Sequence, residues 1–253
     1  MALLTVKNIR KTYGDTIAVD GVSFSVRAGE TVAIMGPSGC GKSTTIRMIN
    51  KLVVPDSGSV FVDGHDVLAL SSNELRQMRK RIGFVFQSFR LIGRLTAREN
   101  VMLGLVTDGM AKEEAALIAD EMLAKVGMQA HRDDLPRELS GGGQQRVAIA
   151  RALAFHPPVI LWDEPTASLD PILVREVLLI MEELAEDRAA AMVVVTHELP
   201  FALRVADRIL LMDKGRIVEE GTPADVFGHP RSDIGRRYRD LMAYQTDTTR
   251  STL

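Results

Sequence analysis

The sequence has a single cysteine, Cys40, among 253 residues, so no disulfide can form within the chain. This composition suits a reducing compartment. The formal net charge is only −2, which argues against a general polyanion binder, and nucleic acid is not expected as a partner. The longest apolar runs, such as residues 189–195, fall far short of the ~20 residues that span a bilayer. With no signal-peptide pattern at the N-terminus either, we expect a soluble chain that can still sit against a membrane protein.

Short apolar strand patterns and helical patterns alternate along the chain. This alternation predicts an α/β fold with a mostly parallel sheet. Together with the glycine-rich motif at residues 36–43, it predicts a P-loop NTPase core. Short strands are expected within residues 3–35, as an N-terminal antiparallel β region that leads into the first buried strand. The other expected strands cover residues 60–62, 82–86, 159–162, 192–195, 209–212 and 216–218, and the expected helices include 44–52, 144–155 and 171–186.

A block of helical pattern interrupts this alternation and is expected to form an inserted α-helical subdomain over residues 88–158. Ile118, Met122 and Val126 repeat at helical spacing there, and Gly127 is a suitable C-cap. We expect one domain over residues 1–245, in which 1–87 and 159–222 form the nucleotide-binding core. The polar tail, residues 246–253, is expected to fray.

Residues 36–43 match the pattern G-x-x-x-x-G-K-[ST], with a strand pattern before them and a helical pattern after them. In such a loop backbone N–H groups surround phosphate oxygens, and the helix start adds partial positive charge. Lys42 is expected to reach the β- and γ-phosphates of ATP, and Ser43 to bind Mg²⁺. Cys40 is expected to be a compact loop residue and not a reactive thiol. The predicted nucleotide-binding residues are Gly36, Pro37, Ser38, Gly39, Cys40, Gly41, Lys42, Ser43 and Thr44.

Polar residues follow three of the predicted strands. Asp163 is placed to hold Mg²⁺, and Glu164 to polarise a water for attack on the γ-phosphate. His197 can hydrogen-bond the γ-phosphate, although a histidine at a strand end is usually structural. Gln87 can sense Mg²⁺ and the attacking water, or, taken alone, be an ordinary loop residue. The predicted catalytic residues are Glu164, His197 and Gln87, and the predicted metal ligands are Ser43, Gln87 and Asp163.

Residues 139–146, which we call the signature segment, read L-S-G-G-G-Q-Q-R and open into a helical pattern. A serine and glycines at a helix start form a second anion-binding site, well downstream of the phosphate loop. The phosphate loop alone indicates nucleotide binding. The second anion site favours an active site built from two chains, each of which supplies a different half.

Together these motifs resemble the ATP-binding cassette (ABC) transporter ATPase subunits, over about residues 3–240. The resemblance implies a head-to-tail homodimer that closes over two ATP molecules. Ser140, Gly141 and Gly142 of one subunit would contact the γ-phosphate held by Lys42 of the other. The resemblance also implies that Tyr13 stacks on adenine and that Asp170 lies in a loop that crosses the dimer interface.

The sequence departs from the family pattern at two places. Gly143 stands where the family commonly has glutamine, and Ala167 and Ser168 are exchanged relative to the usual order. The serine and the two glycines that face phosphate in the family remain, so activity is expected. Gly143 could loosen the first helical turn by up to ~1 kcal/mol and so weaken closure of the dimer.

Four segments resemble importers for polar amino acids, and similar segments occur in phosphonate and glycine-betaine importers: residues 49–52, 86–91, 95–101 and 217–221. The resemblance implies integral membrane permease subunits as partners, an extracytoplasmic solute-binding protein, and a peripheral position on the cytoplasmic face of the membrane. The alternatives are an exporter ATPase, a nucleotide-gated module without a permease, and an ordinary P-loop phosphotransferase. The last of these leaves the signature segment unexplained.

Overall fold

The computed structural model describes residues 2–250, with side chains up to residue 242. The chain divides into two compact units, which we describe separately. The first consists of the residues up to Ala69 and from Val193 onward, and the second is Leu70–Met192. The second unit therefore contains more than the helical block expected over residues 88–158. It also includes strands and a further helix that pack against the helices of that block.

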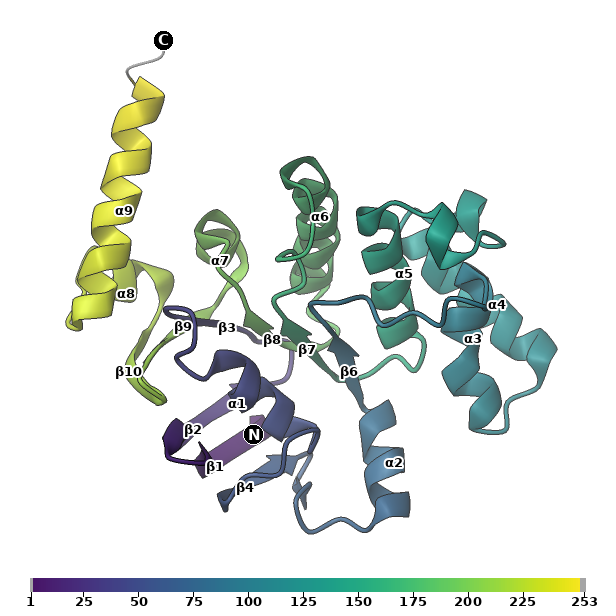
Figure 1. Cartoon of the computed structure of the whole chain (residues 1–253), viewed down its shortest axis with the longest axis horizontal. Helices are drawn as coiled ribbons and strands as arrows, with labels where there is room; N and C mark the ends of the chain where they lie inside the picture. The colour runs from purple at the N-terminus through teal and green to yellow at the C-terminus, as the bar shows by residue number, and fades with distance from the viewer. Residues whose placement is uncertain (1, 251–253) are drawn as a thin grey trace. The chain divides into compact units, whose positions relative to one another are not determined.

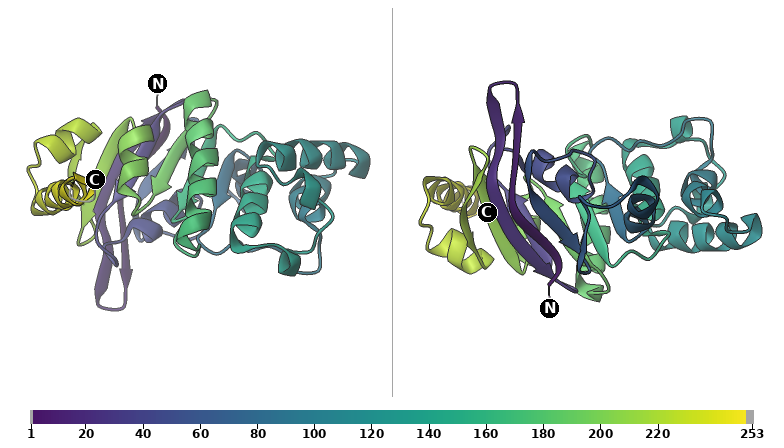
Figure 2. Two further views of the ribbon diagram at one scale, coloured as in Figure 1. Left: turned by 90° about the horizontal axis from the view of Figure 1, so that it is seen from above. Right: turned by 90° about the horizontal axis from the view of Figure 1, so that it is seen from below.

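The N-terminal region forms an antiparallel sheet, as expected, but its first two strands are long. β1 (Ala2–Tyr13) and β2 (Thr16–Arg27) pair along their whole length, and Figure 2 shows them as one extended ribbon. Register shifts along this pair let the strands bend without ending. β4 (Ser57–Val62) and β5 (His65–Asp66) complete the strand order β2-β1-β4-β5.

The larger sheet contains the buried apolar strands, in the order β10-β9-β3-β8-β7-β6. β9 pairs parallel with β3 and β6 parallel with β7, which agrees with the expected mostly parallel sheet. β9 and β10 form the expected antiparallel hairpin, and positive φ angles at Lys214 and Gly215 make its tight turn. The strands are β3 (Thr31–Met35), β6 (Ile82–Val85), β7 (Val159–Asp163), β8 (Ala191–Val195), β9 (Arg208–Asp213) and β10 (Arg216–Gly221).

Helices of the first unit cover the core formed by β3 and β9. α7 (Leu199–Val205), α8 (Pro223–Gly228) and α9 (Asp233–Arg250) bring apolar side chains onto Ala33, Met35, Ile209 and Leu211. α1 (Lys42–Ile49) is shorter than the helix expected over 44–52 and starts earlier. α9 continues to Arg250, and the expected fraying of the polar tail stays a prediction; residues 251–253 lie outside the described part of the chain.

In the second unit α3, α4 and α5 pack against one another, as Figure 1 shows. Gly127 follows α4 with a φ of 68°, the C-cap conformation that the sequence predicts. α5 starts three residues before the expected residue 144, at Gly141. The helices are α2 (Ser72–Lys80), α3 (Ala97–Thr107), α4 (Lys112–Lys125), α5 (Gly141–Leu153) and α6 (Pro171–Asp187), with short 3₁₀ turns at Gln129–His131 and Pro136–Glu138. Within the described residues, none of the helices is both long and apolar enough to cross a bilayer.

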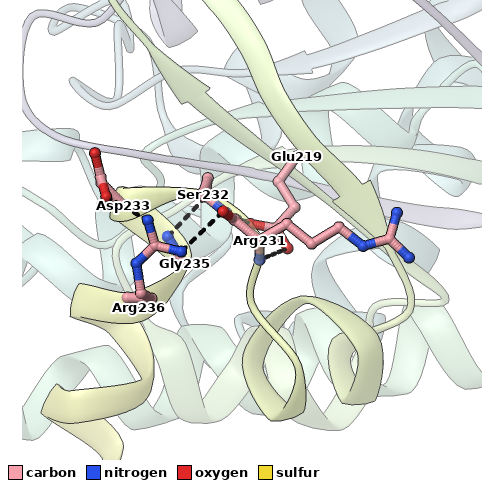
Figure 3. Close-up of polar contacts among 6 residues, drawn as sticks. All are labelled: Glu219, Arg231, Ser232, Asp233, Gly235 and Arg236. Carbon is pink, nitrogen blue, oxygen red and sulfur yellow. Dashed lines mark hydrogen bonds and ion pairs between the residues drawn. The ribbon is translucent and has the colours of Figure 1, made fainter.

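The helix start of α9 is bound to strand β10 through one carboxylate. Glu219 accepts hydrogen bonds from the backbone N–H groups of Arg231 (2.8 Å) and Ser232 (2.9 Å), and also from the Ser232 hydroxyl (Figure 3). Ser232 in turn accepts from the N–H of Gly235 at 2.9 Å. A Cβ atom on Gly235 would lie 2.6 Å from Glu219 Oε2 and 2.8 Å from Pro230 Cβ, so any larger residue there would require these neighbours to shift.

We expect Glu219→Ala to lower the free energy of unfolding by about 1–3 kcal/mol, because it leaves N–H groups at the α9 start without their charged acceptor. Glu220→Ala is the matched control, since its exposed ion pair with Arg208 contributes less.

Burial acts to raise the pKa of Glu219, but the hydrogen bonds from Ser232 and Arg231 outweigh it, and the net pKa is lowered. The contribution should therefore be present above the ordinary glutamate pKa and be lost as the pH falls through the lowered value. Urea unfolding of both variants at several pH values checks this, and equal losses in the two variants would contradict it.

Candidate nucleotide-binding site

The phosphate loop follows β3 and leads into α1, as the sequence predicts. Close contacts with neighbouring backbone atoms restrict two of its positions to glycine. A Cβ atom on Gly36 would lie 2.1 Å from the carbonyl oxygen of Met212, and one on Gly41 would lie 2.2 Å from that of Ala18. Both glycines also have positive φ angles, 149° and 104°. No other residue fits at either place, so the loop backbone runs closely against β9 and β2.

Lys42 is almost completely buried, and its ammonium group donates to the carbonyl oxygens of Gly36 (3.0 Å) and Pro37 (3.1 Å). The side chain thus folds back over the loop. α1 begins at Lys42, and its cap residue, Gly41, makes no side-chain hydrogen bond to the first helical turn. A helix start without a side-chain cap suits an anion that accepts hydrogen bonds from the backbone N–H groups of the first turn.

Cys40 is buried within the loop, and burial raises the pKa of its thiol. The thiol therefore stays protonated at neutral pH, which agrees with the expected packing role. The backbone oxygen of Cys40 accepts from Gly215 N at 3.0 Å, so the β9–β10 turn holds the loop as well.

The first unit also carries Tyr13 and His197, the other nucleotide-contacting residues expected from this part of the sequence. Tyr13 ends β1 with half of its surface exposed, so its ring face is accessible for stacking, and Lys11 Nζ lies 5.5 Å from the ring centroid. His197 is exposed and comes two residues after β8. The structure thus leaves both side chains accessible, as a ligand contact requires.

Sequence patterns did not indicate a role for Tyr238, which contacts the phosphate loop from α9. Its hydroxyl forms a hydrogen bond with the backbone of Gly36, and burial raises its pKa. Its ring packs edge-on against Phe227 at 5.9 Å between centroids. The C-terminal helix is therefore bound to the residue that begins the phosphate loop.

The second unit carries the expected carboxylates. Asp163 ends β7 and is fully buried, and Glu164 follows it with a φ of 49°. A glutamate in the left-handed region is uncommon, and strained residues of this kind cluster at functional sites. Asp170 caps α6, because its Oδ1 accepts from Ile172 N at 2.9 Å. This gives Asp170 a structural role besides the one implied at a dimer interface.

The signature segment begins α5 with Ser140 as the N-cap, and its hydroxyl accepts from Gly143 N at 3.1 Å. A Cβ atom on Gly142 would lie 3.2 Å from Leu173 Cβ, which is a tight contact, whereas one on Gly143 would have its nearest neighbour at 3.4 Å. Leu173 lies in the first turn of α6 and is partly buried against this glycine. A side chain at Gly142 would therefore press against Leu173, whereas one at Gly143 would make ordinary contacts.

A phosphate loop between a buried strand and a helix, together with a serine-capped, glycine-rich start of α5 in the second unit, is typical of a P-loop NTPase of the cassette type. Gln87 follows β6 in the second unit with its side chain partly exposed. Gln145 and Arg151 bind the loop around Gln87, and the sequence did not single them out. The only signal was Arg151, a charged side chain within the apolar run of residues 147–154, whereas Gln145 stands between two other polar residues.

Comparison with known proteins agrees with this class. The family model described as ABC transporter matches residues 19–167. The chain is 45% identical over 251 residues to the L-cystine transport system ATP-binding protein TcyN of Escherichia coli (strain K12), covering 97% of this chain and 100% of that protein. It is 49% identical over 231 residues to the glutamine transport ATP-binding protein GlnQ of the same organism, covering 91% of this chain and 95% of that protein.

Solved structures agree as well. The dimeric ATP-binding cassette MJ0796 in a post-hydrolysis state with ADP and Pi has a TM-score of 0.79 and 40% identity, covering 87% of this chain and 98% of that one. The cassette cbiO1 from Clostridium perfringens has a TM-score of 0.80 and 30% identity, covering 90% and 91%. This chain belongs to the ABC transporter family, and it is an ATPase of that family.

We expect Gly143→Ala to stabilise the start of α5 by up to about 1 kcal/mol, because alanine fits the space and has a higher helix propensity. Gly142→Ala should instead destabilise the protein, since Leu173 would have to move. Thermal unfolding of the two variants beside the parent protein checks both expectations. A Gly143→Ala variant less stable than the parent would show that this glycine has a packing role.

Proposed function

We propose that this chain is the ATP-hydrolysing subunit of an importer for a small polar amino acid. One observation carries the proposal: the high identity to TcyN and GlnQ, named for cystine and glutamine transport, extends over both units and nearly the full length of each chain. The probable amino-acid import ATP-binding protein YxeO of Bacillus subtilis (strain 168), 42% identical over 239 residues, supports the same class of cargo.

In this proposal ATP binds with its phosphates on residues 36–44 and its adenine against Tyr13. The helix start of α1 and the Lys42 ammonium supply the positive charge that phosphate requires. The oxygen donors assigned to Mg²⁺ are the Ser43 hydroxyl, the Asp163 carboxylate and the Gln87 amide, and hard oxygen ligands of this kind fit that ion. When bound, the ion would neutralise phosphate charge.

For hydrolysis we assign the water to Glu164, whose carboxylate can orient it and accept its proton as the water oxygen bonds to the γ-phosphorus; the bond from that phosphorus to the β–γ bridging oxygen breaks, and ADP leaves with the electron pair. His197 is assigned a hydrogen bond to the γ-phosphate. The exposed imidazole at the end of β8 and the left-handed backbone at Glu164 support these two roles.

The proposed working form is a head-to-tail homodimer on the cytoplasmic face of a membrane, bound to permease subunits that a solute-binding protein supplies with cargo. Ser140, Gly141 and Gly142 of one chain would contact the γ-phosphate on Lys42 of the partner subunit. The capped helix start at Ser140 supports this role. ATP would drive closure because it binds the closed dimer more tightly than the open form.

Other cargoes remain as alternatives to test, namely phosphonates and glycine betaine, together with export or a permease-free module. These alternatives are distinguished by purifying the intact membrane complex and identifying, by mass spectrometry, the small molecules bound to its partners. A polar amino acid is the expected finding. A phosphonate or a betaine would contradict the assigned cargo, and a chain that purifies from membranes without any permease would contradict the transport role.

We expect Glu164→Gln to keep ATP binding and to trap a dimer with Mg-ATP, because binding continues while hydrolysis stops. Gel filtration with and without Mg-ATP measures this. The double variant Lys42→Ala/Glu164→Gln is the control and should remain monomeric. If Glu164→Gln alone also stays monomeric under saturating Mg-ATP, the two-chain active site is wrong.

Lys42→Ala should also abolish the stabilisation of the fold by ATP. A single site at 100 times its dissociation constant contributes about 2.7 kcal/mol, which thermal unfolding detects readily. An undiminished thermal shift in Lys42→Ala would show that the nucleotide binds elsewhere.

A further inference from the structure

The loop that carries Gln87 is tied to the signature helix at both of its ends. We call residues 86–90 the Gln87 loop. Arg151 on α5 donates to the carbonyl oxygens of Arg90 (2.7 Å) and Phe89 (3.0 Å). Gln145, also on α5, donates to the carbonyl oxygen of Phe86 at 3.3 Å. Three backbone oxygens that flank Gln87 thus have partners on the one helix that begins at the signature segment.

These bonds hold a backbone conformation that is unfavourable by itself. Arg90 has a φ of 51°, a left-handed conformation that costs about 1 kcal/mol or more for a residue with a side chain and persists where its surroundings fix it. Arg151 fixes the carbonyl of this same residue. The Arg90 guanidinium lies over the ring of Phe86, 4.5 Å from its centroid, and closes the loop on itself.

Both side chains from α5 are placed where polar groups are costly. Gln145 is fully buried, and burial lowers the pKa of Arg151. A buried amide, or a partly buried guanidinium such as that of Arg151, is costly when its donors are unused, so both side chains depend on the loop carbonyls that they bind. Loop and helix therefore stabilise each other, and neither can shift without loss of these hydrogen bonds.

We propose that Arg151 and Gln145 are positioning residues that join the Gln87 loop to the signature segment, so that both move as one body when ATP binds. This inference rests on the proposed ATPase role. Gln87 is assigned to the nucleotide of its own chain, and Ser140 to the γ-phosphate on the partner subunit. The α5 side chains would thus couple the position of Gln87 at the nucleotide of its own chain to the position of Ser140 at the nucleotide on the partner subunit.

The test uses the full-length chain and separates nucleotide binding from turnover. Arg151→Met removes both donors but keeps a long apolar stem. We expect kcat to fall about 10- to 100-fold because the assembled site is misplaced, with less than about a twofold change in the Kd for ATP. The phosphate loop should keep its affinity because it is built from elements of the first unit. Arg151→Lys, which keeps one charged donor, should restore part of kcat.

A second readout follows dimer formation. In the Glu164→Gln background, Arg151→Met should weaken the Mg-ATP-dependent dimer at least about tenfold, measured by sedimentation at several protein concentrations. Arg76→Met is the matched control: this exposed arginine of the same unit also donates to a backbone oxygen, that of Thr107 at 2.8 Å, but not to the Gln87 loop. It should leave kcat and dimer formation unchanged.

Where Arg151→Met does not fold, Gln145→Leu and Arg151→Lys test the same coupling at lower cost to the fold, and each should lower kcat with little change in the Kd for ATP. The inference is overturned if these variants lose only thermal stability while kcat and dimer formation stay at the parent values. A parent protein that neither hydrolyses ATP nor dimerises as Glu164→Gln would refute the proposed function itself, and this inference with it.

Discussion

The close approach of backbone to backbone at the phosphate loop is the constraint on which the first unit depends. Gly36 and Gly41 lie so near the carbonyls of Met212 and Ala18 that no side chain fits. A relay of hydrogen bonds extends the contact, from Asp20 N to Gly215 O and from Gly215 N to Cys40 O. Segments separated by nearly 200 positions in the chain thus meet at one loop, and their contacts define its shape.

The C-terminal helix, α9, also contributes to this arrangement. Glu219 binds the start of α9 to β10, and Tyr238 on α9 bonds the backbone of Gly36. β10 also pairs with β9, which supplies the carbonyl of Met212 against the loop. Residues beyond the motifs of the family therefore contribute to the shape of the phosphate loop, through ordinary packing and hydrogen bonding.

The second unit is organised around α5. Its start offers Ser140 as a cap, its second glycine packs tightly against Leu173, and its later turns send Gln145 and Arg151 to the Gln87 loop. Intrinsic propensity disfavours a helix that begins with three glycines. The cap and this packing override the propensity, which explains why the pattern alone placed the helix start at residue 144.

Local chemistry in the sequence determined the α/β class, the position of the phosphate-loop motif, the β9–β10 hairpin and the cap at Gly127, because each is recognised from residues close together in the chain. Tertiary structure decided the length of β1 and β2, the helices after residue 198, the strained backbone at Arg90 and the roles of Tyr238, Arg151 and Gln145. Each of these depends on a partner distant in sequence. A single sequence records which residues are present, whereas only the folded chain specifies which backbone groups lie within hydrogen-bonding distance of them.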